Sequence, residues 1–485
     1  MTVIKQRAAG VLMHLSSLHG DYSVGSFGKE AFEFIDFLAN AGFSYWQVLP
    51  FNIPDDCDSP YKSVSAFAGN PYFIDLPTLS KEGLITSLEL ANAQQQTPYL
   101  VESRRLAESR ELLLRKAASR ATNRDEIYCF ITEHPFLDEA CRFFALDKAN
   151  CYLPWQLWKT DRYDDRDYFY HAFTQYHFHN QWQAVKSYAN QKNISIIGDL
   201  PIYVGLHSAD VYFHPDQFEL DERGYPTGIA GCPPDYFSAD GQMWGNPLYR
   251  WNVMKKDGFH WWRARMEHML SLFDGVRIDH FRGIESYWRI PATAETAREG
   301  KWCKGPGMAF VRAMKAVAGD QMIIAEDLGD IPPAVQQLLE KSGFPGMRVF
   351  QFAFLGDQNS PHLPHNYPSN CLAYTGTHDN NTLLGYVWEQ DADTRRQMLE
   401  YCGYTDADWN NGYDAIIRTM MLSHAGLVIL PIQDLLRFGA DTRMNTPGRA
   451  VGNWRYRITR EQFEGLDVAK YRKLNELYGR LSRSR

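Results

Sequence analysis

The 485-residue sequence predicts an α/β fold, a (β/α)8 TIM barrel with large helical and loop insertions. Two observations lead to this prediction. Eight short runs rich in β-branched, aliphatic and aromatic residues recur along the chain, as buried strands do. Most of them are followed by a polar, glycine-containing stretch and then by a helical pattern. Strands that alternate with helices form a parallel sheet, and eight such units close into a barrel.

The expected strands cover residues 10–15, 45–50, 195–201, 275–279, 322–327, 347–354, 372–377 and 427–432. The segment "KEAFEFIDFLANAGF" after the first strand has helical spacing of its apolar residues, at Ala31, Phe34, Ile35 and Leu38. Gly42 then provides a helix stop. A doubly wound open sheet is the main alternative, and the absence of a G-x-G-x-x-G turn after the first strand disfavours it.

We expect one catalytic barrel over residues 1–485, interrupted twice. The gap between the second and third strands is too long for one crossover, so residues 80–190 are predicted to form a helical insertion subdomain. Its most regular helical segment is 102–121, where charges alternate in sign. Residues 202–255 are rich in Pro, Gly, Tyr and Trp with little periodicity, which predicts a loop-rich insertion over the active site.

The amino-acid composition indicates which kinds of molecule the protein binds and in which compartment it is found. The net charge of −8 without a basic block disfavours nucleic acid and anionic membranes. Aromatic residues make up 14% of the chain, and their flat apolar faces suit sugars. The eight cysteines are scattered without a C-x-x-C pair, as in reduced intracellular proteins. The N-terminal apolar stretch is short and broken by His14, and no apolar run is long enough to span a membrane. We therefore expect a soluble, cytoplasmic protein.

The sequence gives no support for a metal or another cofactor. His171, His177 and His179 lack the H-E-x-x-H spacing of zinc sites, and we expect them on the polar side of a helix. No EF-hand or phosphate-binding loop is present in the sequence. We expect neither a metal nor a cofactor.

Carboxylates follow the ends of four expected strands, at Asp199, Asp279, Glu326 and Asp379. In a parallel barrel these ends meet at one rim, where active sites lie. Side chains alternate along a strand, so Arg277 and Asp279 share a face. The arginine favours the ionised form of Asp279, which a nucleophile needs. An ion pair that closes one end of the barrel is the alternative interpretation.

Glu326 has a different setting, because it follows the apolar "IIA" and precedes Asp327. Apolar surroundings and a like charge both raise a carboxyl pKa, which suits a general acid near neutral pH. One ionised and one protonated carboxyl across a glycosidic bond are what glycoside cleavage requires. Asp379, between His378 and Asn380, would hold sugar hydroxyls and strain the ring. A loop Asx-turn is the alternative for Asp379.

Several motifs resemble the amylomaltases, the 4-alpha-glucanotransferases or disproportionating enzymes of glycoside hydrolase family 77. They include "SPYKSVSAFAGNP", "GDLPIYV", "AGCPPDYFSADGQMWGNPLYRW", "VRIDHFRG", "AEDLG", "GTHDNNT" and "MNTPGRAVGNWRYR". The resemblance runs along nearly the whole chain. It implies transfer of α-1,4-glucan segments to the 4-hydroxyl of an acceptor glucan or glucose, by a retaining double displacement. The expected partners are α-1,4-glucans and maltooligosaccharides of starch or glycogen metabolism, and the expected state is a monomer or weak homo-oligomer.

The resemblance also implies residue roles, with Asp279 as nucleophile, Glu326 as general acid/base and Asp379 as transition-state stabiliser. The residues that it implies in substrate binding are Tyr61, Asp199, Asp235, Tyr236, Trp244, Arg277, His378, Asn445 and Asn453. The chain departs from the family pattern at Lys62, where Gln is expected, and at Asn381, where an acidic residue is expected. These departures bear on groove polarity and chain-length preference, and not on the three carboxylates.

Two other functions fit parts of the pattern. An α-glucan hydrolase would use the same three carboxylates, with water in place of a sugar acceptor. The segment 230–251, with Tyr236, Phe237 and Trp244, is a candidate lid that would exclude water, or else a structural loop on the barrel rim. A non-catalytic glucan-binding barrel is the second alternative, and the complete carboxylate set argues against it.

Overall fold

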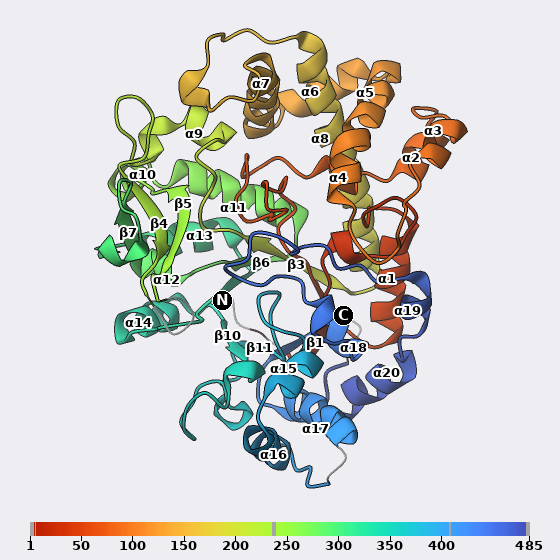
Figure 1. Cartoon of the computed structure of the whole chain (residues 1–485), viewed down its shortest axis with the longest axis vertical. Helices are drawn as coiled ribbons and strands as arrows, with labels where there is room; N and C mark the ends of the chain where they lie inside the picture. The colour runs from red at the N-terminus through yellow and green to blue at the C-terminus, as the bar shows by residue number, and fades with distance from the viewer. Residues whose placement is uncertain (1–3, 5, 235–238, 407–408, 482–485) are drawn as a thin grey trace.

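The computed structural model describes residues 4, 6–234, 239–406 and 409–481 (Figure 1). Eight strands form the central sheet: β1 (Ala8–Leu12), β2 (Tyr45–Gln47), β3 (Ser195–Leu200), β6 (Gly275–Ile278), β9 (Met322–Ala325), β10 (Gly346–Val349), β11 (Cys371–Tyr374) and β12 (Leu427–Pro431). Their order is β10-β11-β12-β1-β2-β3-β6-β9, and the paired neighbours run parallel. The ring closes where the Ala325 N–H donates to the Pro345 carbonyl at 3.0 Å. The predicted (β/α)8 barrel is confirmed.

Each predicted strand run overlaps one strand, but the strands are shorter than predicted. The run 347–354 shows why, since β10 ends at Val349 and the chain turns into a short 3-10 helix at Phe350–Phe352. The first predicted helix is α1 (Lys29–Asn40), which buries Ala31, Phe34, Ile35, Phe37 and Leu38. Gly42, with φ of 78°, allows the turn that follows α1.

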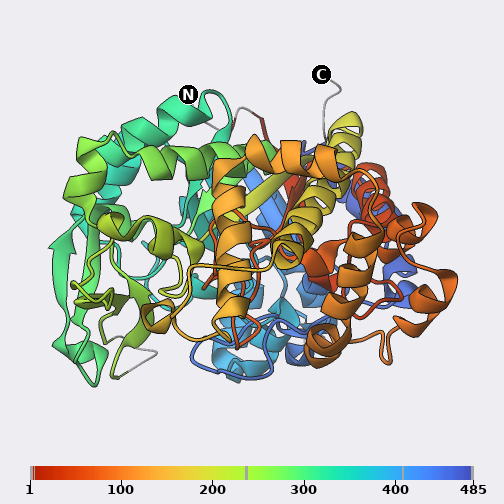
Figure 2. The ribbon, with the colours of Figure 1, turned by 90° about the horizontal axis from the view of Figure 1, so that it is seen from above.

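Most of the chain between β2 and β3 is helical. The helices are α2 (Leu76–Lys81), α3 (Ser87–Asn92), α4 (Ser103–Arg105), α5 (Glu111–Arg120), α6 (Arg124–Thr132), α7 (Pro135–Ala149) and α8 (Asp165–Gln191). A π-helical turn at Leu106–Arg110 interrupts the segment that was predicted as regular, 102–121. Figure 2 shows the red and orange helices of the first 120 residues at one side of the molecule and the green sheet described below at the other. That residues 80–190 form a subdomain of their own stays a prediction.

The three histidines of α8 do not lie on a polar face, so that interpretation is wrong. His177 is buried, and burial lowers the pKa of His171 to about 3 and the pKa of both His177 and His179 to about 4. The reason is that α8 packs against α1, α5, α6 and α7 at once, so little of it faces water.

A second, antiparallel sheet was not anticipated from the sequence. It has the order β5-β4-β7-β8 and consists of β4 (Gly228–Cys232), β5 (Gln242–Pro247), β7 (Ser286–Pro291) and β8 (Lys301–Lys304). Two of these strands lie inside the segment predicted as loop-rich, 202–255. Their alternation is hidden because β4 is short, rich in glycine and shifts register between Ile229 and Gly231. This sheet stands beside the end of β6 (Figure 1).

Further helices surround the barrel: α9 (Ala209–Phe213), α10 (Trp251–Lys256), α11 (His260–Leu272), α12 (Arg282–Glu285), α13 (Met308–Ala318), α14 (Pro333–Ser342), α15 (Leu383–Glu389), α16 (Ala392–Tyr401), α17 (Trp409–Leu422), α18 (Ile432–Leu435), α19 (Arg460–Glu464) and α20 (Val468–Leu477). Trp46, Trp182 and Phe273 belong to the aromatic core between the barrel and α8. Among the described residues, no helix combines the length and the apolar character that crossing a bilayer requires.

Candidate active site

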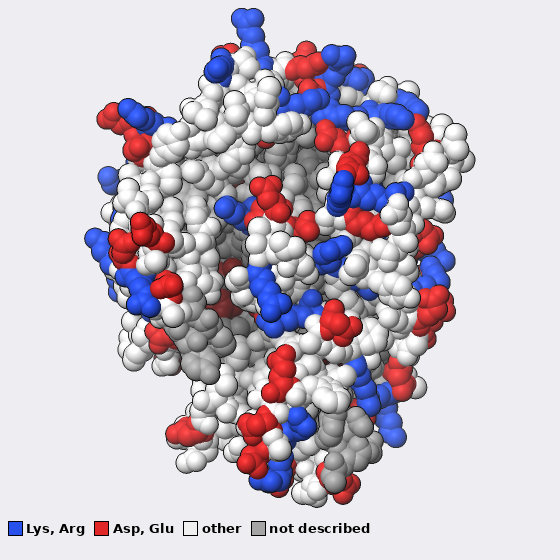
Figure 3. All heavy atoms as spheres, viewed as in Figure 1, with Lys and Arg blue, Asp and Glu red and all other residues white. Residues whose placement is uncertain are grey.

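A cavity of about 980 Å³ opens at the rim where the barrel strands end. Residues that follow β6, β9 and β11 line its floor and walls, together with the segments 59–62, 352–362 and 445–448. Figure 3 shows a hollow close to the middle of this face of the molecule. Active sites of parallel barrels lie at this rim.

Asp279 stands directly after β6, and Arg277 lies beside it. The Asp279 N–H donates to the Leu200 carbonyl at 3.0 Å, which fixes this strand end against β3. Arg277 Nη2 lies 3.0 Å from Asp279 Oδ1, so the predicted shared face is confirmed. The other guanidinium nitrogen, Nη1, lies 2.7 Å from Asp199 Oδ1. Although burial opposes its charge, Asp199 and Asp279 hold the pKa of Arg277 well above its ordinary value.

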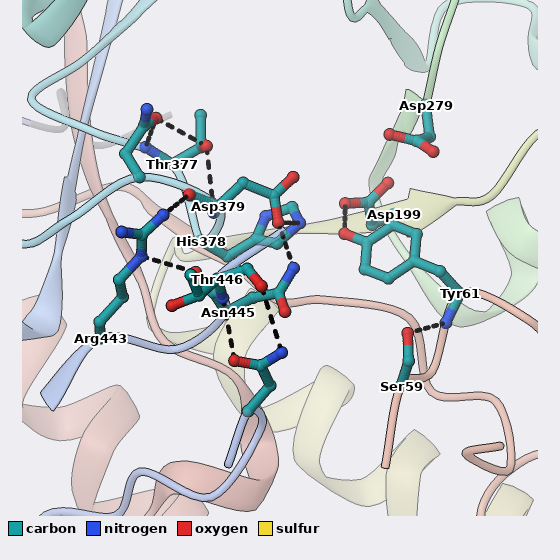
Figure 4. Close-up of polar contacts among 12 residues, drawn as sticks. Ser59, Tyr61, Asp199, Asp279, Thr377, His378, Asp379, Arg443, Asn445 and Thr446 are labelled. Carbon is teal, nitrogen blue, oxygen red and sulfur yellow. Dashed lines mark hydrogen bonds and ion pairs between the residues drawn. The ribbon is translucent and has the colours of Figure 1, made fainter. Parts of the chain in front are cut away.

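Asp199 is fully buried behind the cavity wall and is held by two partners. Tyr61 Oη donates to Asp199 Oδ2 at 2.8 Å, and Arg277 supplies the charge-assisted bond described above. Tyr61 itself lines the cavity and stacks on His378, with ring centroids 5.2 Å apart and planes at 15°. Asp199 therefore orients Arg277 and Tyr61 from behind. Figure 4 shows its hydrogen bond with Tyr61.

Glu326 follows β9, and two backbone N–H groups donate to its carboxylate. Its Oε2 accepts from the His280 N–H at 2.7 Å and its Oε1 from the Leu328 N–H at 2.8 Å. His280 has a φ of 49°, a left-handed conformation that residues other than glycine rarely adopt. Such backbone strain is concentrated at functional sites, and here the turn presents the His280 N–H to Glu326.

The surroundings of the Glu326 carboxyl favour its protonated form. Burial raises its pKa to about 7, Arg277 opposes the shift, and Asp279 adds to it. The like charge was predicted to be Asp327, and this is wrong. Asp327 pairs with Arg348 at 2.9 Å instead, because consecutive side chains at a strand end point to opposite sides.

Asp379 is held by a segment that lies more than sixty residues further along the chain. Asn445 Nδ2 donates to Asp379 Oδ1 at 2.6 Å. Arg443 Nη2 donates to the Asp379 carbonyl at 2.5 Å, and its Nε donates to the Asn445 carbonyl at 2.7 Å. His378 Nε2 lies 3.4 Å from Asp379 Oδ1. The carboxylate thus accepts a hydrogen bond from a side chain across the rim, and it also lies close to the His378 ring of its own turn (Figure 4).

The structure brings most of the predicted site residues together in the lining of one cavity. These are Tyr61, Trp244, Arg277, Asp279, Glu326, His378, Asp379 and Asn445. Asn453 is buried and holds the loop 446–449, accepting from the Thr446 N–H at 3.0 Å and donating to the Arg449 carbonyl at 2.8 Å. Asp235, Tyr236 and Phe237 lie outside the described residues.

Sequence reasoning missed three residues of the site. His280 and Trp454 line the cavity, and Arg443 fixes Asp379 from behind. His280 could have been noticed inside "RIDHFRG", where it directly follows the nucleophile candidate. Arg443 and Trp454 follow β12 in a loop, so neither strand ends nor periodicity marked them.

The two departures from the family pattern have different settings. Lys62 lines the cavity and places a cation in its wall. Asn381 is buried, and its Nδ2 donates to Glu389 Oε1 on α15 at 2.7 Å. An amide at position 381 therefore still finds a carboxylate partner.

An eight-stranded parallel barrel whose rim holds three carboxylates in an aromatic-walled cavity has the architecture of enzymes that act on glycosidic bonds. The comparisons with known proteins narrow this class. The chain belongs to the 4-alpha-glucanotransferase family, glycoside hydrolase family 77, whose model matches residues 13–462. The resemblance seen in the sequence motifs is confirmed.

Relatives match over almost the full chain. The 4-alpha-glucanotransferase of Thermus thermophilus is 41% identical over 98% of this chain and 99% of its own. That of Clostridium butyricum is 40% identical over 96% and 100%. The solved structure of an amylomaltase from Streptococcus agalactiae in complex with acarbose superposes with a TM-score of 0.93, at 36% identity over 98% of this chain and all of the other.

Proposed function

We propose that this member of the 4-alpha-glucanotransferase family transfers a segment of an α-1,4-glucan to the 4-hydroxyl of an acceptor glucan or glucose. Asp279 acts as the nucleophile, Glu326 as the general acid/base and Asp379 as the transition-state stabiliser. The observation that carries the proposal is that all three carboxylates line one cavity in three distinct electrostatic settings. Retaining cleavage needs this combination of an ionised and a protonated carboxyl.

In the first step the donor glucan loses its reducing-end segment. Glu326, protonated near neutral pH because of its raised pKa, donates its proton to the glycosidic oxygen. Asp279, beside the Arg277 guanidinium, attacks the anomeric carbon as that C–O bond breaks. The products are a covalent glycosyl-enzyme ester on Asp279 and a released glucan with a new 4-hydroxyl.

In the second step an acceptor takes the place of the released segment. Glu326, now ionised, removes the proton from the acceptor 4-hydroxyl, and that oxygen attacks the anomeric carbon. The ester bond to Asp279 breaks, and a new α-1,4 bond forms. Two inversions give net retention of configuration.

Asp379 and His378 would bind the hydroxyls of the reacting glucose. Hydrogen bonds that strengthen as the ring flattens stabilise the oxocarbenium-like transition state. Asn445 and Arg443 keep the Asp379 carboxylate and its backbone in place for this task. Pre-organised groups stabilise developing charge because they need no reorganisation during the reaction.

The aromatic side chains of the wall fit glucan rings. Tyr61, Trp244 and Trp454 line the cavity from three separate segments, and sugar C–H faces stack on such rings. The similarity to an amylomaltase solved with acarbose supports binding of α-1,4-glucans and maltooligosaccharides. Within this proposal glucose is an acceptor, the enzyme acts in the cytoplasm, and it works as a monomer or weak homo-oligomer.

Incubation with maltotriose tests the proposal against both alternatives. Transfer produces glucose together with oligosaccharides longer than the substrate. Glucose and maltose as the sole products would identify a hydrolase, and an unchanged substrate would identify a non-catalytic binding barrel. The Asp279→Asn variant is the control, and it must yield none of these products while melting near the wild-type temperature.

A further inference from the structure

Trp302 on β8 is a large aromatic residue that is 40% exposed at the outer edge of the antiparallel sheet. The guanidinium carbon of Arg282 lies 3.8 Å from the centroid of its ring. Trp288, opposite Trp302 on β7, packs against it edge-on, with centroids 5.1 Å apart at 67°. A guanidinium over an indole face gains about 0.5–2 kcal/mol from the cation–π interaction. Trp302 therefore holds Arg282 in a fixed place.

Arg282 is the first residue of α12, three positions after Asp279, and it is buried. Its Nη1 donates to the backbone carbonyl of Asp330 and lies 3.0 Å from Asp330 Oδ2. The side chain of Asp330 is 88% exposed, so the ion pair itself contributes little. The bond to the carbonyl matters more, because it fixes the course of the chain at residue 330.

The clamped chain is the loop that follows Glu326. Leu328 donates its N–H to Glu326 Oε1, and both Leu328 and Gly329 line the catalytic cavity. The loop 326–330 is thus anchored at β9 on one side and by Arg282 on the other. Between these anchors its Leu328 N–H orients the Glu326 carboxyl.

The opposite edge of the same sheet also contacts this region. Trp244 on β5 packs edge-on against the ring of His280, with centroids 5.0 Å apart. His280 in turn donates its N–H to Glu326 Oε2. Both edges of the antiparallel sheet therefore contact the turn 280–282. One edge is connected through His280 to Glu326 Oε2, and the other is connected through Arg282 and the loop 326–330 to Glu326 Oε1.

We propose that Trp302 and Arg282 are positioning residues for the transfer reaction: Trp302 holds the Arg282 guanidinium, and Arg282 clamps the loop 326–330 so that Glu326 stays covered and oriented. This role rests on the function proposed above for Glu326. The antiparallel sheet thereby helps to position the acid/base carboxyl. This role is additional to placing Trp244 in the cavity lining.

The sign of the pH effect follows from the causes that set the Glu326 pKa. Burial is the largest cause and raises the pKa, while the bond from the Leu328 N–H is a smaller cause in the opposite direction. A loosened loop weakens both the burial of Glu326 and its bond from the Leu328 N–H, and the loss of burial has the larger effect on the pKa. The pKa of Glu326 then falls toward its ordinary value, and the alkaline limb of kcat moves to lower pH.

The experiment compares variants of the full chain in a maltotriose transfer assay. Trp302→Ala and Arg282→Ala should each lower kcat about tenfold or more, since small misplacements of a catalytic group have large effects. Their KM should stay within about twofold of wild type, because no substrate contact is removed. Their alkaline limb should move about half a pH unit to lower pH. Trp302→Phe keeps an aromatic face and should restore most of the loss.

Three further variants separate the clamp from general damage. Met243→Ala removes a side chain with the same 40% exposure from β5 of the same sheet and should match wild type. Asp330→Ala keeps the clamped carbonyl and should also match wild type. The double variant Trp302→Ala/Arg282→Ala should be no worse than Arg282→Ala alone, because both act through one contact chain.

Hydrogen exchange provides a readout that does not depend on activity. The Leu328 amide should exchange faster in Trp302→Ala than in wild type or Met243→Ala. An unchanged pH profile together with unchanged exchange overturns the proposal. A rise in KM for long glucans without a pH shift also overturns it, since Trp302 would then be a glucan contact. If Arg282→Ala does not fold, the exposed Trp302 carries the test. If wild type does not transfer, the proposed function fails, and the exchange experiment still tests the clamp.

Discussion

The two halves of the catalytic rim hold their carboxylates in different ways. Asp279 and Glu326 stand directly at the ends of β6 and β9, and backbone hydrogen bonds to Leu200, His280 and Leu328 fix them. Asp379 comes five residues after the end of β11, and its carboxylate depends on a side chain from another loop, Asn445. The side chain of Asp279 is 27% exposed and that of Asp379 is 46% exposed.

This difference shows which of the three carboxylates the barrel strands position directly. The groups that we propose to exchange a proton and to form a covalent bond, Glu326 and Asp279, lie at strand ends, where the sheet fixes their position. The group assigned to transition-state stabilisation is assembled from two loops. A strand-side substitution that leaves a buried charge without its partner, as at Arg277, should therefore affect both chemistry and stability. Substitutions on the loop side should affect chemistry with little change in stability.

The largest effect is expected at Asp279, the proposed nucleophile. Asp279→Asn should lower kcat by about 10⁴-fold or more, because removal of a nucleophile leaves only binding and the remaining groups. Initial rates of maltotriose disproportionation measure this loss, and a melting curve close to wild type is the control. Retention of more than a tenth of the activity would remove Asp279 from its role.

Next comes Arg277→Ala, where chemistry and stability should fall together. It leaves the Asp199 carboxylate buried without its cation, which costs about 3–5 kcal/mol of unfolding free energy. It also removes the cation beside Asp279, and kcat should drop by about 10²–10³-fold. Chemical denaturation and transfer kinetics measure the two losses, and a stable but inactive variant would break the expected link.

The pH dependence tests the strand side without mutation. Transfer should decline above about pH 7, because Glu326 must be protonated to donate its proton and its pKa is raised to about 7 by burial. The stability of the folded state depends on the same proton and also falls as the pH rises. The folded state binds this proton more tightly than the unfolded state, so stability falls as pH rises from about 4.5 to 7. Glu326→Gln should remove this loss, seen as a higher melting temperature relative to wild type at pH 8 than at pH 5.

The smallest effect is expected on the loop side, at Asn445→Ala. This variant loses the 2.6 Å bond that orients the Asp379 carboxylate, so kcat should fall about tenfold. The unfolding free energy should change by less than about 1 kcal/mol, because the bond is at the half-exposed rim. Asn453→Ala is a useful comparison, since that side chain bonds only the loop backbone behind the wall. A stability loss in Asn445→Ala as large as in Arg277→Ala would contradict the proposed difference between the strand side and the loop side.

The sequence predicted the strand side better than the loop side, for a physical reason. A carboxylate after an apolar run is a local pattern, and parallel strands place such ends together, so Asp279 and Glu326 could be found without coordinates. The charge neighbour of Glu326 was assigned to Asp327 by adjacency, whereas the fold places Asp279 there. The contact of Asp379 with Arg443 and Asn445 joins two loops that lie more than sixty residues apart in the sequence, and no periodicity reports such a contact.

The difference between local patterns and long-range contacts also explains the errors in the predicted fold. The eight barrel strands have continuous apolar runs and were found. The strands β4 and β8 are short, one is rich in glycine and the other carries two lysines, so neither shows the usual alternation. Arg282 and Trp302 were missed with that sheet, since their contact depends on its position beside α12.

Trapping the covalent intermediate tests the assignment of the nucleophile most directly. The Glu326→Gln variant, supplied with an activated α-maltosyl donor whose leaving group needs no acid, should accumulate an ester because its breakdown needs the base. Digestion and mass spectrometry should place the glycosyl adduct on the peptide that contains Asp279. An adduct on Asp199 or Asp379, or turnover of the activated donor by the Asp279→Asn variant at the wild-type rate, would contradict the assignment.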